Sequence, residues 1–169
     1  MRRIFVTLAL ILTTFSFSYG QRFAYVDTEY ILSKIPAYQE AQNSLDAVAD
    51  EWRKEIEKRL QEIDKMYRTF QAEQVLLTDQ MKQQRINEIE KKERDVKEYQ
   101  KAKFGPDGEL FKKRQELIKP IQDDIYEQIQ KLATSKGYDF IFDKSSGVSM
   151  LFASDRYDKS DDIIDALGY

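Results

Sequence analysis

A long helical repeat of apolar residues over residues 38–77 most constrains how this chain can fold. The apolar residues recur in steps of three and four, which is the spacing of one face of an α-helix. The repeat consists of Ala41, Leu45, Val48, Trp52, Ile56, Leu60, Ile63, Tyr67 and Phe70. Such a helix would be about 60 Å long. Because it cannot bury its apolar stripe against itself, it needs a partner helix.

The next segment supplies that partner. Thr78 and Asp79 suit a turn or a helix cap. Beyond them a sparser apolar stripe continues through Met81, Ile86, Ile89, Val96 and Tyr99. We therefore predict an antiparallel helical hairpin with its tip near residues 75–82. Because neither Gly nor Pro marks this turn, one continuous helix is the alternative interpretation.

Residues 105–108, Gly-Pro-Asp-Gly, are the clearest interruption of the helical pattern. Gly105 is expected to end one helix and Pro106 to begin the next. Gly105 and Gly108 are also candidate hinge residues. The repeat then resumes and contains Pro120, where we expect a kink or a short loss of hydrogen bonding. The whole hairpin is assigned to residues 37–136.

The segment before the hairpin, residues 21–36, predicts a strand and a short helix. Residues 22–27 are rich in strand-forming residues. Asp27 or Thr28 is placed to cap a brief helix, and Pro36 suits the first turn of the next helix.

The segment after the hairpin, residues 137–169, predicts two strands and a helix. Residues 138–143 and 148–153 read as strands joined by a turn at residues 144–147. Ser160 is placed to cap a final helix over residues 161–167. The predicted fold class is therefore α+β and mostly α, with a small β-body and a long helical-hairpin arm. Because so small a sheet is marginal alone, we expect several copies of the chain to pool their strands in a homo-oligomer.

The N-terminal residues 1–20 have the pattern of an export signal. Arg2 and Arg3 precede an apolar run that is short for a membrane span, and small residues precede a predicted cut between Gly20 and Gln21. An uncleaved anchor is the alternative. Nothing later in the chain is apolar enough to span a bilayer. These features predict an exported protein.

Composition excludes most catalytic chemistry. The chain has no histidine and no cysteine, which rules out Ser-His-Asp and Cys-His sites and the usual zinc sites. We expect no catalytic residue, no metal and no cofactor. After loss of the N-terminal segment, 25 basic and 30 acidic residues remain without a basic stripe, so nucleic acid is not an expected partner.

The order of these elements resembles the Skp/OmpH family of periplasmic chaperones. The resemblance rests on the strand at residues 23–27, the long hairpin, the strands at 138–143 and 149–153, and the acidic helix at 160–167. It implies a trimer in which three arms surround a cavity that holds unfolded outer-membrane proteins without ATP. The chain departs from the best-known members, which are strongly basic, so attraction to clients or lipopolysaccharide does not carry over.

Two sets of arm residues are candidates for function. The first is expected to form the seam between the two helices of the hairpin: Trp52, Ile56, Leu60, Ile63, Tyr67 and Phe70. The second is expected to contact clients, because a Val-Leu-Leu run cannot direct all its side chains one way and methionine adapts to varied partners. This set is Met66, Val75, Leu76, Leu77 and Met81. Packing at the tip is the alternative role for the second set. For the chain as a whole, the alternatives are a structural coiled-coil protein of the envelope and an adaptor for a folded partner.

Overall fold

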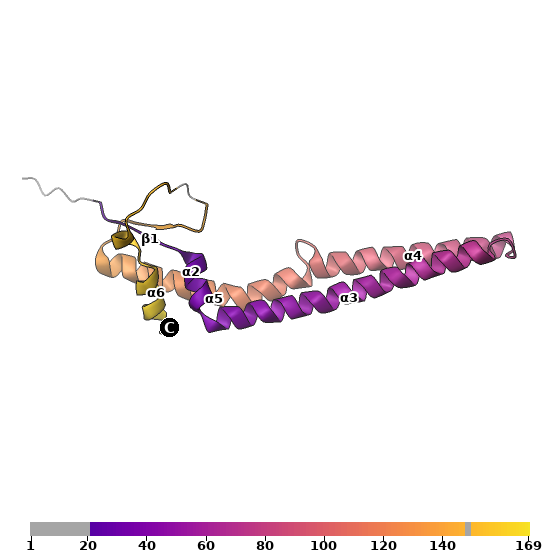
Figure 1. Ribbon diagram of the computed structural model, residues 1–169, viewed down its shortest axis with the longest axis horizontal. Helices are drawn as coiled ribbons and strands as arrows, with labels where there is room; N and C mark the ends of the chain where they lie inside the picture. The colour runs from indigo at the N-terminus through magenta and orange to yellow at the C-terminus, as the bar shows by residue number, and fades with distance from the viewer. Residues whose placement is uncertain (1–20, 148–149) are drawn as a thin grey trace, which may run out of the picture.

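The computed structural model describes residues 21–147 and 150–169, and shows a long arm that projects from a small body (Figure 1). The predicted export signal, residues 1–20, lies outside the described residues. The elements are β1 (Phe23–Val26), α2 (Thr28–Lys34), α3 (Pro36–Glu73), α4 (Asp79–Phe104), α5 (Glu109–Lys136), β2 (Phe140–Asp143), a 3-10 turn (Asp155–Tyr157) and α6 (Ser160–Leu167). The predicted class, α+β and mostly α, is confirmed.

The arm is built around α3, whose 38 residues span about 57 Å. Pro36 occupies the first turn of α3, where its missing N–H costs nothing. Before it, the Asp27 side chain accepts a hydrogen bond from the Tyr30 amide and caps α2. Both local signals act as the sequence predicts.

A turn at residues 74–78 separates α3 from α4, and the two helices run side by side in opposite directions (Figure 1). The Thr78 hydroxyl accepts a hydrogen bond from the Met81 amide at 3.3 Å and caps α4. The predicted hairpin is therefore present, and the alternative of one continuous helix is wrong.

The break after α4 differs in detail from the prediction. Gly105 follows the last residue of α4, as expected, but α5 begins at Glu109 and not at Pro106. Gly108 lies directly before α5 with ordinary extended backbone angles. Beyond it, α5 remains one helix through Pro120.

The sheet also differs from the prediction. β1 and β2 pair in parallel, with Phe23 opposite Phe140 and Val26 opposite Asp143. Parallel strands need a long crossover connection, and here the whole arm is that connection. The predicted antiparallel hairpin is wrong for the described residues, because residues 150–153 form no strand and β2 pairs with β1 instead. Val148 and Ser149 lie outside the described residues.

The body has a core of its own. One buried cluster of six side chains joins β1, α2, α5 and α6. Its members are Val26, Ile31, Ile35 (directly after α2), Ile125, Ile163 and Ile164. A second cluster of Ala41, Leu45 and Ile118 joins the bases of α3 and α5. The C-terminal half of α5 thus packs in the body, although the sequence assigns it to the arm.

Candidate functional site

The seam between α3 and α4 is a thin row of apolar side chains. Ile63, Ile89 and Val96 are buried together. Ile56, Met66 and Phe70 pack against them and are partly buried. Ile56, Ile63 and Phe70 were predicted seam residues, and the structure brings all three together. Met66, predicted as a client contact, also packs in this row.

Two predicted seam residues lie at its edge. Leu60 is 52% exposed, so its assignment to the seam is wrong. Tyr67 is 41% exposed, and its hydroxyl donates a hydrogen bond to Glu93 of α4 at 3.1 Å. Leu60 comes directly after Arg59, and Tyr67 directly after Met66. Arg59 and Met66 are the residues that face α4, and their spacing is close to that of a coiled coil.

Arg59 takes the seam position that an apolar residue would normally fill. Its guanidinium lies 4.2 Å from the centre of the Tyr99 ring and binds Glu55 of its own helix at 2.7 Å. The bond from Arg59 lowers the pKa of Glu55 below its usual value. Stacking of a cation on an aromatic ring stabilises this pair. The sequence did not reveal Arg59 as a seam residue, because the search for a helical stripe considers apolar residues only.

Trp52 lies at the other end of the seam, near the break. It is buried, and its ring meets Phe104 edge to face at 6.0 Å. The Lys103 ammonium lies 4.7 Å from the Trp52 ring centre and pairs with Glu109 at 2.6 Å. The end of α4 and the start of α5 are therefore both tied to this point on α3.

The tip carries the most exposed apolar residues of the arm. Val75 is 84% exposed and Leu76 83% exposed, while Met81 is 48% exposed. Leu77 is partly buried. Four of the five predicted client contacts therefore lie together at the tip, and the fifth, Met66, lies in the seam.

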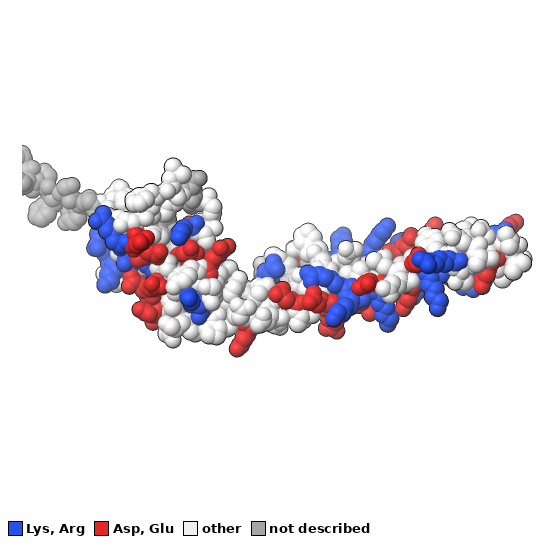
Figure 2. Space-filling view, in the orientation of Figure 1, with Lys and Arg blue, Asp and Glu red and all other residues white. Residues whose placement is uncertain are grey.

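Charge on the arm is mixed, and part of it is paired. Basic and acidic side chains alternate along it, whereas its far end is mostly uncharged in this view (Figure 2). The ion pairs include Arg53–Asp50, Arg68–Asp64 and Lys82–Asp79. Exposed pairs of this kind contribute little stability, typically about 0–1 kcal/mol each. They leave the exposed apolar tip in surroundings of low net charge.

The body presents a second apolar surface on the outer face of its sheet. Val26 and Ile141 face the core, so the alternate positions Phe23, Phe140 and Phe142 face outward. The Phe23 ring stacks on Phe140 at 5.7 Å and on Phe142 at 6.4 Å, yet all three are at least 40% exposed.

A nearby loop extends this surface. Leu151 is 99% exposed and Phe152 86% exposed. A hollow of about 340 Å³ lies between this loop and the outer face of β1 and β2. The outer sheet face and residues 151–152 together are called the aromatic face below.

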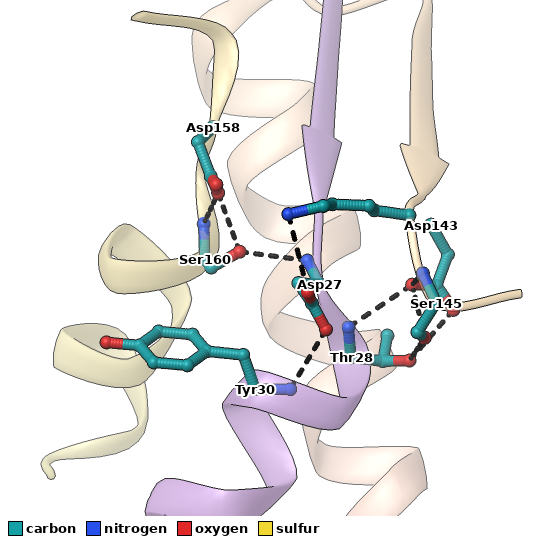
Figure 3. A network of polar contacts seen from close by, with 8 residues as sticks. Asp27, Thr28, Tyr30, Asp143, Ser145, Asp158 and Ser160 are labelled. Atoms are coloured by element: carbon teal, nitrogen blue, oxygen red, sulfur yellow. Dashed lines mark hydrogen bonds and ion pairs between the residues drawn. The ribbon is translucent and has the colours of Figure 1, made fainter. Parts of the chain in front are cut away.

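A polar network fastens the ends of the two strands to α2 and α6 (Figure 3). The Asp143 carboxylate accepts hydrogen bonds from the hydroxyl of Thr28 at 2.8 Å and that of Ser145 at 2.8 Å. Burial raises the pKa of Asp143, but these bonds outweigh it and hold the pKa below its usual value. The network therefore holds the strand ends, α2 and α6 together within the body.

Ser160 belongs to the same network and does not cap α6 as predicted. It is the first residue of that helix. Its hydroxyl donates to Asp158 at 2.6 Å and accepts from the Asp27 amide at 2.8 Å. No local pattern predicts this role, because Asp27 is far away along the chain.

Comparison with known proteins identifies a family and a solved structure that resemble this chain. The sequence model of the family described as "Outer membrane protein (OmpH-like)" matches residues 22–167. This chain belongs to the OmpH-like family. The resemblance to Skp/OmpH proteins drawn from the sequence is thus confirmed.

A solved structure has the same fold. It is a protein of Caulobacter crescentus assigned as an OmpH-like outer membrane chaperone, and it superposes with a TM-score of 0.67 at 11% identity. The alignment covers 91% of this chain and 89% of that one. A search of curated proteins finds no match.

Among residues 21–147 and 150–169, no helix is long and apolar enough to cross a bilayer. Within the same residues, no group of acidic side chains is arranged to hold a metal ion. The features that the structure does offer are the apolar tip, the seam and the aromatic face.

Proposed function

We propose that this OmpH-like protein is an ATP-independent holdase of the periplasm, exported by cleavage between Gly20 and Gln21. It would hold unfolded outer-membrane proteins between its arms and prevent their aggregation. The observation that carries the proposal is the exposure of Val75 and Leu76 at the end of a long arm, beyond the apolar row that joins its two helices.

The apolar tip suits weak and unselective binding. A fully buried Val or Leu side chain contributes about 1.5–3 kcal/mol relative to an exposed one. A few such contacts hold an unfolded chain without fixing its conformation. The charges around them are of both signs and provide no strong attraction for a folded partner. Release then needs only competition from a tighter acceptor of the client.

The aromatic face supports assembly of the body from several copies, and we infer a homotrimer from the family resemblance. Phe23, Phe140 and Phe142 form an exposed stack beside an open strand edge. Pairing of that edge with strands of sister copies would enlarge the small sheet, and packing of the bodies together would bury the aromatic stack. Three arms from one body would then surround a shared space for the client.

Aggregation of a diluted, urea-unfolded β-barrel protein tests the holdase role. We expect the purified protein, at modest excess, to suppress the rise in light scattering. Val75→Ser together with Leu76→Ser should weaken suppression several-fold, because two exposed apolar contacts are lost. Gln71→Ser with Gln74→Ser, which changes two exposed polar residues just before Val75, is the matched control and should act like the unchanged protein. No suppression by the unchanged protein would favour a structural spacer or an adaptor.

The oligomer is tested by mass in solution. We expect sedimentation to give the mass of a trimer for the unchanged protein. Phe140→Asp should shift the distribution to monomer, because it places a charge in the buried interface. Lys131→Asp, an exposed change on α5, is expected to leave the trimer intact. A monomeric unchanged protein would contradict the pooled body.

A further inference from the structure

A small slot opens between α3 and α4, one turn behind the tip. It is lined by Lys65, Met66, Thr69 and Phe70 of α3 and by Arg85 and Ile89 of α4. Its volume is about 150 Å³. A cavity of roughly that volume lined by apolar side chains holds a benzene ring. The slot therefore has room for one aromatic or branched aliphatic side chain.

The floor of the slot is apolar and firmly placed. Ile89 is 2% exposed and belongs to the buried row of the seam. Phe70 and Met66 pack against the same row. Methionine sulfur makes favourable contacts with aromatic rings and adapts to different shapes. A ring that enters the slot would meet Met66, Phe70 and Ile89 at once.

The rim of the slot has charge of one sign. Lys65 and Arg85 stand on opposite helices, and no acidic residue lines the slot. Arg85 has a contact of 3.3 Å with Glu88 and remains 53% exposed. The neighbouring slot toward the body differs, because Glu55, Glu62 and Asp95 line it together with Arg59 and Lys92. The slot behind the tip is thus the one of the two that favours an anion.

We propose that this slot binds an aromatic side chain of an unfolded client when a carboxylate lies beside that side chain in the sequence. The ring would fill the apolar floor, and the carboxylate would lie between Lys65 and Arg85. The proposal rests on the proposed holdase function and gives it a preferred class of segment, acidic-aromatic sequence. It also gives Met66 a direct role with clients that is compatible with its place in the seam.

The experiment uses a short dye-labelled peptide with one Phe flanked by Asp residues, and measures its fluorescence anisotropy with the purified protein at low ionic strength. Two further peptides replace Asp by Lys, or Phe by Ala. We expect the acidic-aromatic peptide to bind most tightly. Lys65→Gln and Arg85→Gln should each weaken it about two- to fivefold, the range for an exposed charge pair. Added salt should remove the same preference.

Two variants distinguish peptide binding in the slot from the effects of a general change in charge or shape. Thr69→Trp should fill the slot and reduce binding of the acidic-aromatic peptide to the level of the Phe→Ala peptide. Lys92→Gln removes one positive charge from the neighbouring slot and should leave binding unchanged. Equal binding of the three peptides, or an equal loss with Lys92→Gln, would overturn the proposal.

The light-scattering assay keeps this proposal distinct from the holdase role. In one outcome, Arg85→Gln leaves peptide binding as it is while the original protein still suppresses aggregation. That result would contradict the proposed role of the slot and leave the holdase role standing. If the unchanged protein does not suppress aggregation but shows the peptide preference, the holdase role is wrong and the slot still binds acidic-aromatic segments.

Discussion

Ile163→Ala is expected to lower the free energy of unfolding of the body by about 2–5 kcal/mol, the usual cost of removing a buried isoleucine side chain beyond Cβ. Ile163 has no exposed surface and packs in a cluster drawn from β1, α2, α5 and α6. The body is small, so one cavity there removes a large share of its stability. The α6 helix should detach first.

Hydrogen exchange of amides in α2 and α6 measures this loss locally, whereas circular dichroism would be dominated by the arm. We expect faster exchange in both helices and little change at the tip. Asp165→Ala, on the exposed face of α6, is the control. Loss of protection no greater than that of the control would show that Ile163 does not hold the body together.

Gly108→Ala is expected to destabilise the junction of α4 and α5 by about 1–3 kcal/mol, the cost of overpacking. A Cβ atom at this position would lie 2.8 Å from the Lys103 carbonyl oxygen and 2.9 Å from the Gly105 amide nitrogen. Both atoms are backbone, so they cannot turn away as a flexible side chain would. At Gly105 a Cβ would overlap the Lys101 carbonyl oxygen.

Trp52 reports on this junction, because it is the only tryptophan of the chain and packs against Phe104. We expect Gly108→Ala to shift thermal unfolding followed by Trp52 fluorescence to lower temperature. Asp107→Ala, an exposed neighbour, should not. If Gly108→Ala left this transition unchanged and only slowed the motion of the arm, the glycines would act as the proposed hinge. Close packing of the backbone is the role that the geometry favours.

The helices and the starts of α3 and α4 could be predicted from the sequence because they depend on neighbours along the chain, whereas the start of α5 and the cap of α6 were not predicted correctly. Apolar spacing placed α3, Pro36 placed its start, and Thr78 placed the start of α4. Local patterns did not predict which residue faces the neighbouring helix where a charged side chain fills an apolar position. Leu60 fits the apolar stripe, but Arg59 faces α4 because its flat guanidinium can stack on Tyr99.

What the sequence by itself determined is therefore the long hairpin, the place of Val75 and Leu76 at its tip, and the break after Phe104. Hydrophobic spacing and caps act over one or two turns, so they can be recognised without knowing the fold. Only the tertiary structure decided that β2 pairs with β1 in parallel, that Ser160 bonds Asp27, and that Lys65 and Arg85 share one slot. Those contacts join residues far apart in the chain, and their geometry exists only once the arm has folded back on itself.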